Sequence, residues 1–439
     1  MRKFLIKAGL YICLIFFILN PYTIYGRPGI VISILLVLYA IRSGVYKTNL
    51  KANSLIFSLM ICISLFGALV SYLNGIGQFN HPFAVVSLAI VWLSAQSIYK
   101  LCVQNGISFD EFALMILHVI LLNYSLILME VNFPALRDAV ENFLVPTGNI
   151  DWTDGFRYRG ISASGGAGLS LLLPITASIT LYLYSQMKLG IFFTFISILI
   201  SLLATLVIGR TGLVLLLIVF TSYLILIITR SFNRPRIILG SSVFVILGVL
   251  IFFVGYDYLL SYLDEMFGKG FVSYSFGFLF KGREGIESEG TVGTIAKFLS
   301  ILPTNFPEII TGYGFYGGSD FSPWTDSGYS RMFLSVGWPF GLLFYVCVFY
   351  LFFKNFRINM FLILTMGAIL LAAEAKEPLL FSGNASRVFI LIVVFLSMQR
   401  EAKLSAKNAF IFSTKEKNYE FDATSGIDLM HQRKAIIDI

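Results

Sequence analysis

Long apolar runs, separated by short turns that carry most of the charge, constrain what this chain can fold into. A helix that crosses a lipid bilayer needs about 20 mainly apolar residues, and about twelve stretches of this sequence approach that length. Of the 439 residues, 57% are hydrophobic and only 13% are charged, which is not the composition of a soluble domain. We therefore expect an all-α, polytopic integral membrane protein. The expected segments are 4–20, 28–42, 53–73, 83–101, 112–132, 166–185, 189–207, 211–229, 236–255, 329–352, 359–373 and 384–399.

The basic residues predict how these segments are oriented. By the positive-inside rule, Lys and Arg accumulate in the short turns on the cytoplasmic side. The net charge of +8 is then a topology signal and not a sign of nucleic-acid binding. We expect cytoplasmic N- and C-termini, with a polytopic membrane domain over 1–399 and a cytoplasmic tail over 400–439. The basic residues of the predicted inner turns are Arg42, Lys47, Lys51, Lys100, Lys188, Arg230, Arg234, Arg236, Lys354, Arg357, Arg400 and Lys403.

Two loops on the predicted outer side are long, 133–165 and 256–328. The second loop opens with an amphipathic stretch at 256–267, and its apolar periodicity predicts a helix over 291–302. A Gly-rich turn follows at 312–318. Because the two loops do not occupy matching positions in two halves of the chain, the pattern disfavours an inverted-repeat transporter.

Charged side chains from distant segments converge on the outer side of this topology. A guanidinium beside hydrocarbon costs about 2.5–3.5 kcal/mol even on the lenient insertion scale, so it rarely lacks a partner. Its natural partner is a phosphate or a carboxylate held by two hydrogen bonds. With aromatic rings nearby, such residues suit a sugar attached to a phosphate; the alternative is an interfacial aromatic belt with snorkelling arginines. The charged residues are Arg157, Arg159, Arg210, Arg283, Asp326, Arg331, Lys376 and Arg387, and the aromatic ones are Trp152, Tyr158, Tyr313, Tyr316, Trp324 and Tyr329.

Three of the arginines have a sequence context that favours anion binding. Arg210 occupies a very short outer turn, where Gly209 and Gly212 allow another element or a ligand to approach closely. Arg157 and Arg159 precede a Gly-rich helix start, where free backbone N–H groups favour anions. Snorkelling for the first, and a structural turn for the other two, are the alternatives.

Three carboxylates qualify as a general base. Asp326 directly precedes a predicted spanning helix, so it is either an N-cap or a group that deprotonates or binds a sugar hydroxyl. Glu374 and Glu377 flank Lys376 in the last outer turn. That charged turn is either purely structural or a phosphate contact made by the lysine.

The sequence predicts neither a metal site nor a nucleotide site. His81, expected in a short outer loop, and His118, within a helix, have no second His or Cys as a partner. The four cysteines lie in or at the ends of apolar stretches, which disfavours a disulfide framework. The sequence has no GxSxG motif and no phosphate-binding P-loop. A membrane enzyme without a nucleotide site points to an energy-rich, lipid-linked donor.

These features resemble those of the Wzy-type O-antigen and exopolysaccharide repeat-unit polymerases, over the C-terminal two thirds of the chain. The ordered set of motifs carries the resemblance, rather than any one of them. In chain order they are Arg157 or Arg159 followed by Gly168, the Gly-Arg-Thr-Gly turn at 209–212, Arg283, Pro307, the Gly-rich turn, the residues 326–329, and the helix with Arg331, Gly337 and Gly341.

The resemblance implies a GT-C-like membrane fold of about 12 transmembrane helices, with no required metal or cofactor. It also implies that a growing glycan leaves its undecaprenyl-pyrophosphate carrier and joins the next lipid-linked repeat unit, on the outer face of the cytoplasmic (inner) membrane. Arginines would stabilise the pyrophosphate leaving group and a carboxylate would help to deprotonate the acceptor hydroxyl. The product would be an O-antigen, a capsule or an exopolysaccharide, and the partners a chain-length-regulating co-polymerase and a flippase. The expected catalytic residues are Asp326 and Arg210, and the expected substrate-binding residues are Arg157, Arg159, Arg283, Tyr329, Arg331, Lys376, Glu374 and Glu377.

Two alternatives are weighed against the polymerase. The related O-antigen ligases are expected to carry a histidine in the large outer loop, and 256–328 has none. A lipid-linked oligosaccharide flippase, or another transporter, would line a central cavity with basic residues at mid-membrane depth. Here the basic residues are predicted to gather at one face, and the large outer loop has no evident transport role.

Overall fold

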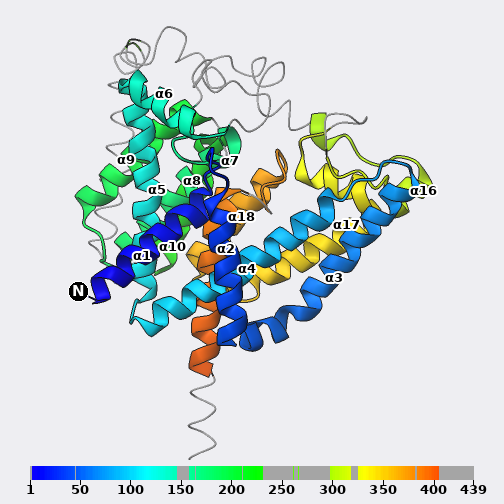
Figure 1. Ribbon diagram of the computed structural model, residues 1–439, viewed down its shortest axis with the longest axis horizontal. Coiled ribbons are helices and arrows are strands. Elements are labelled where there is room, and N and C mark those ends of the chain that lie inside the picture. Colours follow the sequence, from blue (N-terminus) through cyan, green and yellow to red (C-terminus); the bar gives the residue numbers. More distant parts are fainter. Residues whose placement is uncertain are drawn as a thin grey trace, which may run out of the picture.

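The computed structural model describes residues 2–44, 46–145, 158–163, 165–209, 211–230, 261, 265, 297–317, 325–380 and 383–404. Within these ranges the fold is all-helical, apart from isolated β-bridges that join Thr23 to Gly26 and to Leu144 (Figure 1). The all-α prediction is therefore confirmed for the described part of the chain. The elements are α1 (Arg2–Leu19), α2 (Pro28–Ser43), α3 (Tyr46–Leu73), α4 (Asn80–Gln104), α5 (Phe109–Asn132), α6 (Pro134–Phe143), α7 (Gly166–Ser170), α8 (Leu172–Ser185), α9 (Ile191–Ile208), α10 (Thr211–Arg230), α16 (Phe306–Thr311), α17 (Gly328–Phe353), η1 (Phe356–Ile358), α18 (Met360–Glu374) and a C-terminal helix over 384–404.

Six of the described helices are long and apolar enough to cross a membrane, and four shorter apolar helices accompany them. Large hydrophobic side chains such as Leu65, Leu69, Phe83 and Phe349 are exposed on these helices, as contact with lipid requires. The described part of the chain is thus all-helical, and its long apolar helices are those of a membrane protein. Eleven of the twelve expected segments coincide with helices, and 236–255 lies outside the described residues.

The helices form two groups, which are connected by α18 and by the pair of α1 and α2. Helices α5, α8, α9 and α10 pack on one another, whereas α3 packs on both α4 and α17. Helix α18 contacts α8 and α10 from the first group and α17 from the second. Hydroxyl groups inside the bundle donate to carbonyl oxygens one turn earlier in the same helix. Ser201 Oγ donates to Ser197 O and Thr205 Oγ1 donates to Ser201 O, both at 2.7 Å. Such bonds satisfy polar groups where water is excluded.

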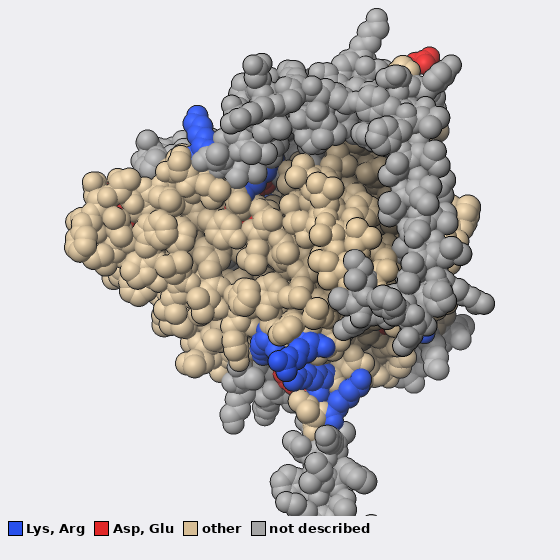
Figure 2. Space-filling model, turned by 180° about the vertical axis from the view of Figure 1, so that it is seen from behind, with Lys and Arg blue, Asp and Glu red and all other residues tan. Residues whose placement is uncertain are grey.

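Basic side chains gather at the end of the bundle from which the C-terminal helix leaves (Figure 2). Lys100 Nζ donates to the carbonyl oxygen of Ser43 at 2.8 Å, and Arg400 Nη1 donates to Asn355 Oδ1 at 2.8 Å. Residues of separate predicted inner turns therefore lie at the same end, as the positive-inside rule requires. That this end faces the cytoplasm stays a prediction.

Helix α17 is not the uninterrupted helix that the sequence predicts over 329–352. Gly337, at φ 77° and ψ 175°, breaks it. In a straight helix Tyr329 and Tyr345 would be about 24 Å apart along the axis, at 1.5 Å per residue. Their ring centroids are instead 4.8 Å apart. The chain therefore folds back at Gly337, and that prediction was wrong because hydropathy does not register a break in the backbone.

The Gly-rich turn after α16 provides hydrogen bonds to the broken part of α17. The backbone N–H of Tyr313 donates to the carbonyl oxygen of Leu334 at 2.7 Å, and that of Gly314 donates to Ser335 O at 3.1 Å. These carbonyls lie just before Gly337, where the helical ladder ends. A buried carbonyl group needs a partner, and the turn supplies it.

The structure corrects the predicted position of His81 and describes only part of the helix predicted over 291–302. His81 lies in the first turn of α4 and is 2% exposed, rather than in an outer loop, because α4 begins at Asn80. Its ring stacks on Tyr316 with centroids 4.7 Å apart. Of the helix expected over 291–302, residues 297–299 are helical and 291–296 lie outside the described residues. The stretch 256–267 also lies outside them, except for 261 and 265.

Candidate functional site

The candidate site lies where the first turn of α17 meets the end of α18 and the start of α10. Contacts of α18 with α17 and with α10 bring these elements together. The C-terminal helix starts beside this region and runs to the opposite, basic end of the bundle (Figure 1). Side chains far apart in the sequence therefore share one end, as expected. They are Asp326, Tyr329, Arg331, Glu374, Lys376 and Glu377.

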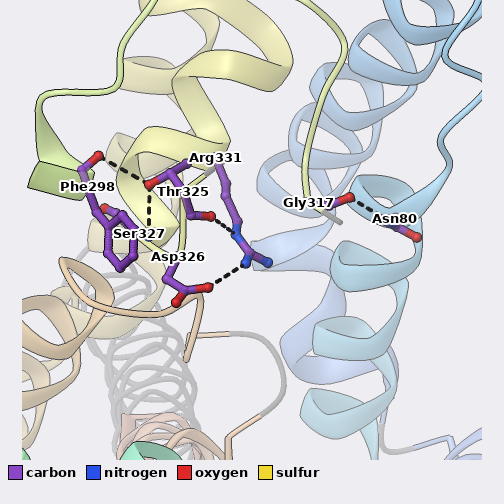
Figure 3. A network of polar contacts seen from close by, with 7 residues as sticks. All are labelled: Asn80, Phe298, Gly317, Thr325, Asp326, Ser327 and Arg331. Carbon is purple, nitrogen blue, oxygen red and sulfur yellow. Dashed lines mark hydrogen bonds and ion pairs between the residues drawn. The ribbon is translucent and has the colours of Figure 1, made fainter. Parts of the chain in front are cut away.

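Arg331 and Asp326 form an ion pair at the start of α17 (Figure 3). Arg331 Nη2 donates to Asp326 Oδ1 at 3.2 Å, and Arg331 Nε donates to the carbonyl oxygen of Thr325 at 2.9 Å. The arginine and aspartate side chains are 18% and 37% exposed, so solvent and ligands reach both groups. Gly317 lies against the guanidinium, and a side chain there would come within 2.7 Å of Arg331 Nη1. The pair combines an anion-binding cation with a carboxylate.

Buried contacts fix the turn that carries Asp326. Thr325 Oγ1 donates to the carbonyl oxygen of Phe298 at 3.2 Å, and Ser330 Oγ donates to the same carbonyl at 2.8 Å. The backbone N–H of Ser327 donates to Thr325 Oγ1 at 3.2 Å. The carboxylate of Asp326 consequently projects from a turn whose own polar groups are satisfied.

The N-cap of α17 is Ser327 and not Asp326. The Ser327 side chain accepts a hydrogen bond from the backbone N–H of Ser330 at 3.4 Å. The structural alternative for Asp326 was therefore wrong, because the helix begins at Gly328, one residue later than that cap would require. Cap and carboxylate are separate residues and can be changed independently.

Glu374 is buried against the N-terminus of α17. Its Oε2 accepts a hydrogen bond from the backbone N–H of Leu380 at 3.0 Å, and its Oε1 accepts one from the Tyr345 hydroxyl at 3.3 Å. Gly328 approaches so closely that a Cβ at that position would collide with Oε1. Glu374 thus ties the start of α17 to the turn after α18, and its full burial separates it from solvent.

Tyr329 also joins α17 to α18. Its hydroxyl donates to the carbonyl oxygen of Leu371 at 2.7 Å, and its ring packs against Tyr345. This contact favours a positioning role over direct contact with a sugar. Sequence reasoning missed Tyr345, because it lies in the middle of an apolar stretch; the only signals were Gly337 and Pro339, which mark a break in a helix.

Lys376 reaches the start of α10. Its Nζ donates to Thr211 Oγ1 at 2.9 Å. Because Thr211 directly follows Arg210 in the chain, the lysine lies beside the Gly-Arg-Thr-Gly turn. Two predicted outer elements, the last turn and this short one, are therefore in contact.

The expected close approach at Gly209 and Gly212 is confirmed. A Cβ at Gly209 would lie 3.3 Å from the backbone of Gly166, and one at Gly212 would collide with the carbonyl oxygen of Ser170. The backbone N–H of Gly212 donates a hydrogen bond to Ser170 Oγ at 3.2 Å. The element that approaches is α7, the Gly-rich helix start of the first outer loop.

Arg159 is fully buried beside α6 and has a carboxylate partner. Its Nε and Nη2 donate to the two carboxylate oxygens of Glu141, and its Nη1 donates to the carbonyl oxygen of Val145 at 3.4 Å. The backbone of the same loop is held by Asn123, whose Oδ1 accepts from Ile161 N at 3.0 Å. Of the two partners expected for this arginine, phosphate or carboxylate, the structure provides the carboxylate.

Four expected site residues remain, and only Glu377 lies within the described residues. Arg157, Arg210 and Arg283 lie outside the described residues, so their roles stay predictions. Glu377 is half-buried, and its carbonyl oxygen accepts from Leu379 N at 2.7 Å within the turn after α18.

The described cluster can hold an anion and accept a proton, since it offers one arginine, one lysine and two solvent-accessible carboxylates, those of Asp326 and Glu377. Among the described residues no group of three His, Cys, Asp or Glu side chains is arranged to hold a metal ion. No protein-family model, no curated protein and no solved structure matches this chain significantly.

Proposed function

We propose that this protein is a Wzy-type polymerase, which joins undecaprenyl-pyrophosphate-linked oligosaccharide repeat units into a surface polysaccharide. The observation that carries the proposal is the partly exposed Arg331–Asp326 pair at one end of an apolar helical bundle, with Lys376 in the neighbouring turn after α18. A lipid-linked glycan would present its phosphate and its sugar to the protein at such an end. Of the motifs that resemble the family, residues 326–329 and Arg331 belong to this cluster, and Thr211 of the Gly-Arg-Thr-Gly turn contacts Lys376.

The residues divide the reaction between them. Arg331 and Lys376, with Arg210 expected beside them, neutralise the pyrophosphate as the bond from the sugar anomeric carbon to the pyrophosphate oxygen breaks. The acceptor hydroxyl oxygen forms the new bond to that carbon, and its proton passes to the Asp326 carboxylate. The pyrophosphate leaves on its lipid. Of the three carboxylates considered as the base, Glu374 is buried and tethered, whereas Asp326 and Glu377 are accessible; Asp326 is favoured because it lies against the guanidinium of Arg331.

The finer architecture belongs to the same proposal. It comprises about 12 transmembrane helices in a GT-C-like arrangement, both termini in the cytoplasm, and the candidate site on the outer face of the cytoplasmic membrane. A single cysteine introduced at Asp326 in a chain whose four natural cysteines are changed to serine should react with a membrane-impermeant maleimide in intact cells or spheroplasts. A cysteine at Lys403 should react only after the membrane is opened. The reverse pattern would overturn the orientation.

The polymerase proposal is tested by the size profile of the surface glycan in a strain that lacks the gene and in its complemented parent. A polymerase predicts that the ladder collapses to one repeat unit on its acceptor, because export and ligation continue. Complementation with Asp326→Asn should leave the collapsed profile. Full-length chains held outside on lipid would instead indicate a ligase, and single units trapped inside a flippase.

A further inference from the structure

We propose that Arg27 and Arg387 form a second anion site, separate from the candidate site, which binds the phosphate of a lipid headgroup. Arg27 precedes α2, whereas Arg387 lies in the first turn of the C-terminal helix and contacts the end of α1. Neither α17, α18 nor α10 contributes a residue. The inference stands without the proposed function.

Arg387 has more hydrogen-bond donors than its surroundings use. Its Nη1 donates to the carbonyl oxygen of Phe17 at 2.7 Å, and its guanidinium carbon lies 5.8 Å from the centre of the Phe17 ring. Its Nε is buried and has no hydrogen-bond acceptor among the described residues. A guanidinium carries five N–H donors, and one carbonyl oxygen accepts only a small part of them.

Arg27 adds a second positive charge nearby without a carboxylate to balance it. It is exposed, and it lies over the ring of Tyr22 at 4.2 Å. The start of α2, which Arg27 precedes, packs on the end of α1 that Arg387 contacts, since a Cβ at Gly29 would lie 2.5 Å from the carbonyl oxygen of Phe16. In the described part of the chain, no Asp or Glu forms an ion pair with either arginine. Two neighbouring arginines with an unused buried donor are the arrangement that an anion would stabilise.

The surroundings favour a lipid phosphate over a soluble anion. Arg27 precedes Pro28 at the N-terminus of α2, where the helix dipole adds to the positive potential. Ile24 and Tyr25, in the same turn, are 57% and 86% exposed. An exposed aliphatic and aromatic pair beside a basic residue is typical of the interface between the apolar bilayer and its headgroups. The planar guanidinium fork matches phosphate oxygens.

The test uses the purified full-length protein in detergent and follows its thermal midpoint with increasing dihexanoyl-phosphatidylglycerol. We expect the lipid to raise Tm, with an apparent affinity at least about ten-fold weaker in Arg27→Gln, since one charge-assisted contact is lost. Arg27→Glu sharpens the test because the introduced carboxylate can pair with Arg387. It should raise Tm without lipid and abolish the lipid-induced shift, which a merely structural arginine would not do.

Arg137→Gln is the matched control, since Arg137 also stacks on a tyrosine, at 4.3 Å from the Tyr158 ring, but lies in α6. It should keep the wild-type response. An unchanged lipid response in Arg27→Glu, an equal loss in Arg137→Gln, or no response in the wild type would each overturn the proposal. A parallel titration with inorganic phosphate distinguishes a lipid headgroup from a soluble anion. A rise in Tm with phosphatidylglycerol but not with phosphate supports a headgroup site. An equal rise with inorganic phosphate that is lost in Arg27→Glu would overturn the headgroup proposal in favour of a soluble-anion site.

Discussion

Helices α5 and α17 have almost the same length and a similarly apolar sequence, yet they are built differently. Helix α5 is 24 residues long and opens with a capping box, in which Ser108 and Glu111 each bond the other's backbone N–H. Helix α17 is 26 residues long and is broken at Gly337. The candidate site lies on the broken helix. Length and hydropathy therefore identify apolar helices in this chain, but they do not distinguish a structural helix from one that positions charged groups.

The difference has a physical cause. An unbroken helix satisfies its own backbone, which is what the bilayer demands. A broken one must obtain hydrogen bonds from elsewhere, and α17 obtains them from the Gly-rich turn at Tyr313 and Gly314. Because of the break, the turns before Gly337 need not run along the axis of the turns after it. The first turn, which carries the Arg331–Asp326 pair, can then lie beside the later part of the helix, where Tyr329 packs on Tyr345.

The largest effect is expected from removing the break. Gly337→Ala places a Cβ against the carbonyl oxygen of Ile310 at a residue with φ of 77°. Backbone strain and overpacking each cost about 1–3 kcal/mol. We expect a large fall in Tm or loss of folded protein, measured by detergent-solubilised yield and thermal unfolding. Gly9→Ala in α1 is the control, since nothing lies within 4 Å of its Cβ, and it should be neutral or stabilising. Equal stability of the two variants would remove the contrast.

The sequence alone could predict much of the helical framework and little of the site's geometry. Apolar runs located eleven helices, because burial in lipid selects for length and composition. The glycines around Arg210 correctly indicated close packing. The break at Gly337, the cap at Ser327 and the tether at Glu374 depend on contacts between residues distant in sequence. The partner of Arg159 was open for the same reason, since Glu141 and a phosphate satisfy a guanidinium equally well.

The second largest effect concerns the two neighbouring residues that the structure separates. Asp326→Asn removes the proposed base, so polymer formation should fall by about 10²–10⁴-fold, the usual contribution of general acid–base catalysis. Ser327→Ala removes the cap and should cost about 1 kcal/mol of stability while polymer length is kept. The readouts are the glycan ladder and thermal unfolding. Loss of polymer in Ser327→Ala with full activity in Asp326→Asn would place the chemistry elsewhere.

A smaller effect is expected at the contact between α18 and α10. Lys376→Gln keeps a donor for Thr211 Oγ1 but removes the positive charge, so polymerisation should fall by about ten-fold, a loss of roughly 1.4 kcal/mol in phosphate stabilisation. Thr211→Val breaks the same hydrogen bond and keeps the charge. If the hydrogen bond alone mattered, Thr211→Val would lose activity and Lys376→Gln would keep it, in a ladder assay at matched expression.

Helix α5 should respond to its own cap without any change in function. Ser108→Ala removes the hydroxyl that accepts from Glu111 N at 3.3 Å, which should cost about 1 kcal/mol. The glycan ladder should stay at its wild-type length, because α5 contributes no residue to the cluster. A shortened ladder in a variant that folds normally would show that the unbroken helix also serves the site.

The smallest expected effect is on the pH dependence of stability, through a hydrogen bond between α16 and the Gly-rich turn that bonds the backbone of α17. The Tyr313 hydroxyl donates to the exposed Glu308 carboxylate; this hydrogen bond lowers the pKa of Glu308 and raises the pKa of Tyr313 to about 12. Because the folded pKa of Glu308 is below its unfolded value of 4.5, its contribution is present above that pH and is lost as the pH falls through the folded pKa. The tyrosine's contribution is present below pH 10 and is lost as the pH rises through about 12. Tyr313→Phe should therefore show a flatter dependence of Tm on pH between about 3 and 6 than the wild type. Identical slopes would mean that the broken helix relies on the backbone bonds of the turn alone.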